Sequence, residues 1–97
     1  MVIVVGLKVK PGKEKELEDA VREMITKVES EEGTLAYVFH RSQHNPGEFL
    51  MYEKYKDKAA FDHHGATPYF KELFGKIGPL LAGEPHIEMY EEVAAKK

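Results

Sequence analysis

The sequence predicts one α+β domain with the element order β-α-β-β-α-β. Three observations support this prediction. Runs of β-branched and aromatic residues alternate with two apolar stripes at helical spacing. A turn signal at His44-Asn45-Pro46-Gly47 separates two of the strand-like runs. The chain of 97 residues suits a single core, so we interpret residues 1–97 as one domain whose tail, 94–97, is expected to be disordered.

The first two elements are predicted as a strand over residues 2–10 and a helix over 13–30. Dense β-branched side chains mark the strand, and Pro11-Gly12 ends it. Gly33 stands just past the helix, where we expect a left-handed C-cap. Apolar side chains recur in the helix at spacings of three and four: Leu17, Ala20, Val21, Met24, Ile25 and Val28.

The middle of the chain predicts an antiparallel hairpin. Its strands run over residues 34–43 and 48–56, and the short turn between them requires them to pair directly. A final strand is expected over 86–93.

The second helical unit is predicted in two pieces. Asp57 is a good N-cap for a short helix over 58–64, which Gly65 interrupts. Thr67 and Pro68 have the residue types that begin another helix. The apolar stripe of that second piece is formed by Phe70, Leu73, Phe74 and Ile77. This order is the ferredoxin-like arrangement, a four-stranded antiparallel sheet with helices on one face.

Both faces of the predicted sheet carry apolar side chains, although a sheet with one wet face should alternate apolar and polar residues. In the strand over 48–56 one face carries Phe49, Met51, Glu53 and Tyr55, and the other carries Leu50 and Tyr52. In the strand over 34–43 one face carries Leu35, Tyr37 and Phe39, and the other carries Ala36 and Val38. Helices cover only one face, so we expect a second copy of the chain to cover the other, which predicts a homodimer in a dimeric α/β barrel. The alternative is an aromatic face in contact with water.

Composition excludes several classes of partner. Fourteen Lys and Arg face seventeen Asp and Glu, a net charge of -3 that disfavours nucleic acid. No run of about 18 apolar residues occurs, so we expect no membrane span. The chain has no cysteine, which suits a cytoplasmic protein and leaves no thiolate nucleophile or ligand.

We expect no metal and no other cofactor. His40 and His44 are four apart on a predicted strand, and His63 and His64 are adjacent on a predicted helix, so neither pair has the spacing of metal ligands. No Gly-rich phosphate loop follows a strand, and no serine occupies a strand-to-helix elbow.

Two ionisable residues are the candidates for chemistry. Glu53 lies among hydrophobic residues of its strand, where burial would raise its pKa and suit it to proton transfer. A structural carboxylate that accepts from a tyrosine hydroxyl is an equal alternative. His64 ends the short helix and is a candidate general base, or a residue that packs the helix break. Spacing alone does not choose between His63 and His64.

Aromatic residues are the candidates for the substrate pocket. Tyr37, Tyr52 and Tyr69 either pack the sheet or supply a proton, and Phe70 and Phe74 form core or pocket wall.

Three segments together resemble the antibiotic biosynthesis monooxygenase family: Glu32-Gly33-Thr34-Leu35-Ala36-Tyr37, Phe49-Leu50-Met51-Tyr52-Glu53-Lys54-Tyr55, and Ala60-Phe61-Asp62-His63-His64-Gly65-Ala66-Thr67-Pro68-Tyr69-Phe70. The closing Glu88-Met89-Tyr90-Glu91 is also similar. The combination is specific, although no single motif is, and it covers nearly the whole chain.

This resemblance implies a dimeric α+β barrel that oxidises phenolic or anthrone-type aromatics with O2 and without metal or flavin. The family's strand glutamate falls on Glu53 and its helix histidine on His64, which selects His64 over His63. The chain departs from the family at Tyr69, where relatives often have histidine, and at Tyr55, where many have tryptophan.

The sequence therefore predicts a cofactor-independent monooxygenase of a small aromatic substrate, in which Glu53 orients His64 and Tyr52 or Tyr69 supplies a proton. An isomerase of a small signal molecule or sugar-derived substrate and a non-enzymatic dimeric small-ligand-binding module remain alternatives with the same fold. Haem-degrading relatives share the fold but resemble this chain less. Their tryptophan corresponds to His64 and their haem-ligating histidine to Phe74, and the chain has no tryptophan.

Overall fold

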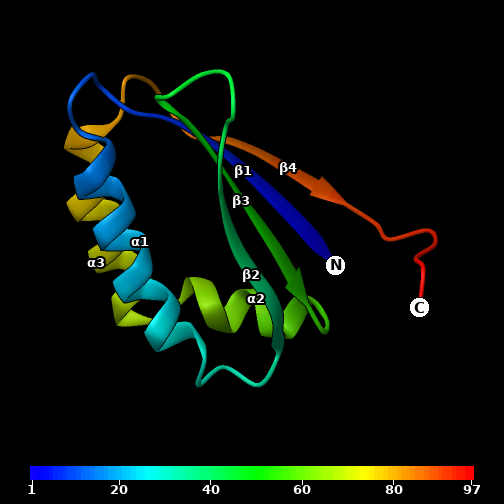
Figure 1. Cartoon of the computed structure of the whole chain (residues 1–97). Helices are drawn as coiled ribbons and strands as arrows, with labels where there is room; N and C mark the ends of the chain where they lie inside the picture. Colours follow the sequence, from blue (N-terminus) through cyan, green and yellow to red (C-terminus); the bar gives the residue numbers. More distant parts are fainter.

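A four-stranded antiparallel sheet forms one layer of the molecule. A computed structural model describes all residues, 1–97. The sheet order is β2-β3-β1-β4, as the ferredoxin-like prediction requires (Figure 1). The four strands are β1 (Val2–Lys8), β2 (Thr34–Arg41), β3 (Glu48–Tyr55) and β4 (His86–Tyr90).

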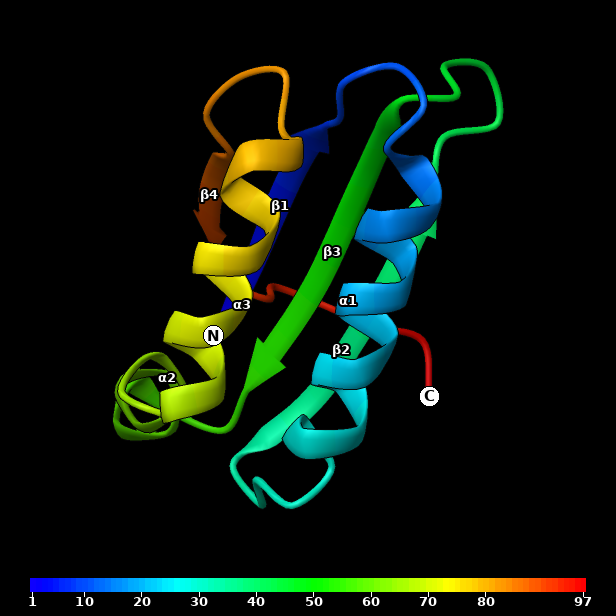
Figure 2. The same ribbon diagram turned by 90° about the vertical axis from the view of Figure 1, so that its left-hand side faces the viewer.

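The helices form a second layer on one face of the sheet. Figure 2 looks onto this face, with α1 and α3 running along the strands and α2, seen nearly end-on, near the C-terminal end of β3. The helical elements are α1 (Glu14–Val28), α2 (Lys58–Gly65), α3 (Pro68–Ile77) and a 3-10 turn, η1 (Gly78–Leu80). No helix is both long and apolar enough to cross a membrane.

Alternation along the strands builds the core. On β3 the side chains of Phe49, Met51, Glu53 and Tyr55 are buried beneath the helices, as the period of two predicts. The facing residues of α1 are buried as predicted, with Leu17 and Val21 nearly inaccessible. Glu53 is thus a carboxylate in the middle of an apolar layer.

Side-chain caps determine where the two short helices begin. Asp57 accepts from the backbone N–H of Ala60 at 2.9 Å and begins α2, and Thr67 accepts from that of Phe70 at 3.2 Å and begins α3. Both caps were predicted. The helix break itself falls one residue later than expected, because α2 includes Gly65.

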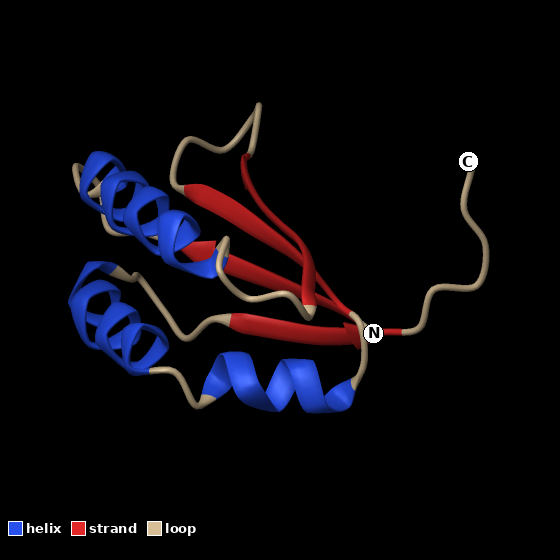
Figure 3. Cartoon of the chain, turned by 90° about the horizontal axis from the view of Figure 1, so that it is seen from below, coloured by secondary structure: helices blue, strands red, loops and turns tan.

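The ends of the elements are shorter than the sequence predicted. β1 ends at Lys8 rather than at residue 10, and β4 ends at Tyr90 rather than at 93. Residues 91–97 follow without regular secondary structure and extend away from the two layers (Figure 3). Glu92 in this segment forms an ion pair with Lys54 at 2.6 Å.

Two local predictions were wrong. A register shift between Thr34 and Ala36 leaves Leu35 exposed, so it does not share the helical face with Tyr37 and Phe39. Gly33 is not a left-handed cap, because Gly12 is the only residue with positive φ. Gly33 is needed for a close approach: a Cβ atom there would overlap the Ala60 side chain of α2.

The close approach of Gly33 to Ala60 leads us to expect opposite effects on stability for alanine substitutions at Gly33 and at Gly75. Gly33→Ala should lower the free energy of unfolding by about 1–3 kcal/mol, because α2 must shift to admit the methyl group. Gly75→Ala, in α3 with no atom near its Cβ position, should raise it by about 0.5–1 kcal/mol through helix propensity. Urea unfolding of both variants measures the difference, and equal effects would contradict the assigned role of Gly33.

Candidate active site

A cavity of about 440 Å³ lies between the sheet and α2 and α3. This volume is in the range of small-molecule sites. Thirteen of its 18 lining residues are hydrophobic, so its walls suit an apolar molecule. Glu53 and His64 line it together with Tyr37, Phe70 and Phe74.

The junction of α2 and α3 positions His64. The Thr67 hydroxyl donates to the backbone carbonyl of His64 at 2.8 Å while it also caps α3, so the last turn of α2 is tied to the next helix. The imidazole is 2% exposed and is surrounded by the rings of Tyr37, Tyr55 and Phe70, with centroids 5.3–5.5 Å away. His64 therefore has little freedom to move.

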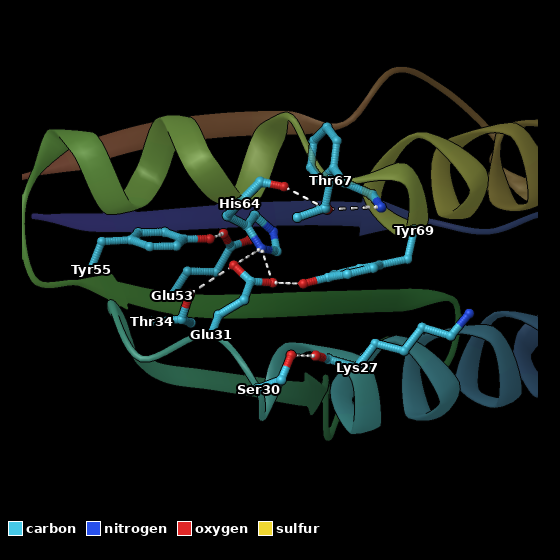
Figure 4. A network of polar contacts seen from close by, with 10 residues as sticks. Lys27, Ser30, Glu31, Thr34, Glu53, Tyr55, His64, Thr67 and Tyr69 are labelled. Carbon is cyan, nitrogen blue, oxygen red and sulfur yellow. Dashed lines mark hydrogen bonds and ion pairs between the residues drawn. The ribbon is translucent and has the colours of Figure 1, made fainter.

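The partner of His64 is Glu31, from the loop between α1 and β2 (Figure 4). His64 Nδ1 lies 3.1 Å from both carboxylate oxygens, and the two side chains are only 2% and 3% exposed. Tyr69 donates its hydroxyl to Glu31 Oε2 at 2.5 Å, and Thr34 donates to Oε1 at 3.2 Å. Glu31 thus accepts from three side chains that come from different parts of the chain.

These donors determine the tautomer of His64. A carboxylate has no hydrogen to donate. Its hydrogen bond with Nδ1 must therefore come from an N–H group, so Nδ1 carries the proton. In the neutral ring the lone pair is then on Nε2. Nε2 is buried and has no hydrogen-bond partner in the protein. The ring that lines the cavity thus has one nitrogen held by Glu31 and one nitrogen without a hydrogen bond.

Glu53 has a different environment. Its Oε1 accepts from the Tyr55 hydroxyl at 2.5 Å, and no lysine or arginine pairs with it. Burial raises the pKa of Glu53 above its usual range, and the Tyr55 hydrogen bond and nearby His64 oppose this shift only in part. Burial, followed by the charge of Glu53, likewise raises the pKa of Tyr55 and that of Tyr37.

The structure corrects the predicted contact between Glu53 and His64. Both residues line the same cavity, but the carboxylate hydrogen-bonded to the imidazole is Glu31. Glu31 is not predictable from the sequence, because it lies in a loop, in a Ser30-Glu31-Glu32 run with the pattern of a solvated helix end. No periodicity distinguishes the buried Glu31 from its exposed neighbour Glu32.

Two of the predicted pocket tyrosines lie outside the cavity. Tyr52 has the opposite parity to Glu53 on β3, so it lies on the sheet face that the helices leave uncovered. Tyr69 points to Glu31 rather than into the cavity, and partial burial and this carboxylate raise its pKa. Neither residue is placed to give a proton to a molecule in the cavity.

No three His, Asp or Glu side chains come together in the chain as they do around a metal ion. His63 is exposed and does not line the cavity of His64. It lines a separate surface groove.

The family model of antibiotic biosynthesis monooxygenases matches residues 1–76. The chain belongs to this family. A crystal structure of a candidate antibiotic biosynthesis monooxygenase from Caulobacter crescentus has a TM-score of 0.92 and 37% identity, over 96% of this chain and 89% of that one. The fold and the resemblance predicted from the sequence are thereby confirmed.

Two relatives of this monooxygenase family are similar over most of the chain. The uncharacterized protein sll1783 of Synechocystis is 34% identical over 91 residues, which are 94% of this chain but only 62% of that protein. YcnE of Bacillus subtilis, named as a candidate monooxygenase, is 30% identical over 84% of this chain and 86% of its own length.

Because only Glu31 belongs to the buried network, we expect substitution of Glu31 to destabilise the protein far more than substitution of its neighbour Glu32. Glu31→Ala should lower the free energy of unfolding by about 3–5 kcal/mol, because His64, Tyr69 and Thr34 lose their common acceptor in a buried site. Glu32→Ala should change it by less than about 0.5 kcal/mol, because Glu32 is exposed. Denaturant titration compares the two, and similar losses would contradict the network.

Proposed function

We propose that this protein is a monooxygenase that oxidises a small aromatic molecule of the quinol or anthrone type with dioxygen, without metal or flavin. The observation that carries the proposal is the buried, unpartnered Nε2 of His64 beside an apolar cavity. Membership of the monooxygenase family supports the reaction class.

His64 is the general base in this proposal. A phenolic O–H or activated C–H of the substrate would face Nε2 and pass its proton to it. Glu31 is a positioning residue: it holds the reactive tautomer and stabilises the imidazolium as the proton arrives. Tyr69 and Thr34 hold Glu31 in turn, which limits its movement during the transfer.

The substrate anion then supplies the electrons. A deprotonated quinol or anthrone is electron-rich enough to reduce dioxygen itself, so the protein's tasks are to remove the proton and to shield the anion from water. Phe70 and Phe74, whose ring centroids are 4.8 Å apart and whose planes are tilted by 55°, offer an apolar aromatic wall for a substrate ring.

The apolar walls favour this reaction over the isomerase alternative. A sugar-derived substrate needs many hydrogen-bond partners, whereas this cavity is lined mostly by hydrophobic residues. A binding module without chemistry would have no need for a base held in one tautomer by a buried carboxylate.

The primary test is oxygen uptake by metal-stripped, flavin-free protein with a panel of hydroquinones and anthrones. We expect His64→Ala to lower turnover of an accepted substrate by about 10²–10⁴-fold, the usual contribution of a general base. The control is His63→Ala, which changes an exposed neighbour outside the cavity and should keep wild-type turnover. Full activity of His64→Ala would overturn the assignment.

We further propose that the protein is a homodimer whose sheets face each other. The sheet face opposite the helices exposes Val38, Leu50 and Tyr90. Helices cover only the other face (Figure 3), so a second copy of the sheet would remove this apolar surface from water.

Sedimentation at micromolar concentration should therefore give twice the chain mass of 11.1 kDa. Val38→Lys should give a folded monomer, because it places a charge on the exposed apolar face without touching the core. A wild-type protein that sediments as a monomer would refute the dimer.

A further inference from the structure

The two buried glutamates differ in their hydrogen-bonding. Glu31 accepts from two hydroxyls and from the imidazole of His64, so both of its oxygens have hydrogen-bond donors. Glu53 accepts one hydrogen bond, from Tyr55 to Oε1, and its Oε2 has no partner. Glu31 is thus held by three hydrogen-bond donors, whereas Glu53 has one and burial raises its pKa.

The surroundings of Glu53 contain no cation that pairs with it. Its neighbours across the strands are Ile3 on β1 and Tyr37 on β2, and it is 7% exposed. A charge in such a place is costly unless it is paired. Glu53 lines the cavity, and its unpartnered Oε2 is the oxygen available to a bound molecule.

We propose that Glu53 is the acid of this cavity: a protonated carboxyl group that donates a hydrogen bond, and during turnover a proton, to an oxygen atom of the bound molecule. The transfer during turnover rests on the function proposed above, whereas the hydrogen bond does not.

The other ionisable groups around Glu53 agree with this role. They are Tyr55 on the same strand, Tyr37 on β2, His64 on α2 and Glu31 in the loop before β2. Burial is the main cause of the raised pKa of Glu53, and the negative Glu31 adds to it. The raised pKa of Tyr37 makes that hydroxyl a poorer acid, which leaves Glu53 as the donor.

The proposed proton transfer balances for an anthrone-type CH2 group. His64 takes one proton, and the carbanion forms a C–O bond to dioxygen, which is reduced to a bound peroxide anion. Glu53 breaks its O–H bond and protonates the outer peroxide oxygen. Cleavage of the O–O bond, with loss of the remaining C–H hydrogen, releases water and leaves the ketone. The proton held by His64 then returns to Glu53, and one O2 has given one carbonyl oxygen and one water.

The first test measures the protonation of Glu53 without any substrate. A carboxyl group whose pKa is raised by folding destabilises the protein as the pH rises above the ordinary value of 4.5. The melting temperature of Glu53→Gln relative to wild type should therefore increase from pH 4.5 towards neutrality. The exposed Glu91→Gln is the control and should show no such trend. A Glu53→Gln protein that loses relative stability over this range would overturn the proposal.

The second test measures hydrogen-bond donation with a matched pair of probes, the ketone fluorenone and the hydrocarbon fluorene. Wild type should bind the ketone several-fold more tightly, as one hydrogen bond allows. Glu53→Gln should keep this preference, because its amide still donates, and Glu53→Leu should abolish it. An unchanged preference in Glu53→Leu would overturn the proposal.

Turnover separates the two proposals. With an accepted substrate, Glu53→Gln should keep KM and lower kcat by about 10²-fold or more, because an amide donates a hydrogen bond but no proton. Full turnover of this variant would overturn the proton transfer. A wild-type protein that oxidises no member of the panel, yet shows the ketone preference, would overturn the proposed function and support Glu53 as a hydrogen-bonding acid.

Discussion

The hydrogen bonds between His64 Nδ1 and Glu31 are the interaction on which the site depends. They connect the loop after α1 to the last turn of α2, two segments 33 residues apart in the chain. Tyr69 brings the first turn of α3 to the same carboxylate. One buried carboxylate thus connects the break between α2 and α3 to the start of β2. The same carboxylate determines the tautomer of the imidazole. Removal of Glu31 leaves His64 Nδ1, the Tyr69 hydroxyl and the Thr34 hydroxyl without their common acceptor.

In our proposal the two buried carboxylates near His64 have separate tasks. Glu31 accepts from two hydroxyls and from the imidazole, while Glu53 lies among hydrophobic strand residues, where burial raises its pKa. A base supported by the first and an acid formed by the second suit a reaction that removes a proton at one step and returns one at a later step. In this proposal the same residue type serves two roles, and the surroundings of each glutamate decide which.

The architecture explains why such a site fits in so small a chain. The helices cover one face of the sheet, and the cavity occupies part of the space where a continuous core would otherwise lie. Core packing concentrates between α1 and the sheet, where Leu17 and Val21 are almost inaccessible. In our proposal a second copy of the sheet adds buried area on the other face, which would offset the packing that the cavity removes.

The sequence by itself determined the order of the elements, the inward direction of Glu53 and the two helix caps. Each of these depends on neighbouring residues: strand parity directs Glu53 into the core, and Asp57 and Thr67 bond to N–H groups three residues away. Tertiary structure decided which glutamate meets His64 and which tyrosines reach the cavity. Glu31 lies in a loop without a period, so its neighbours across the fold become known only when α2 and α3 are packed onto the sheet. For the same reason the close contact of Gly33 with Ala60 could not be predicted, because it joins two segments whose separation no local pattern encodes.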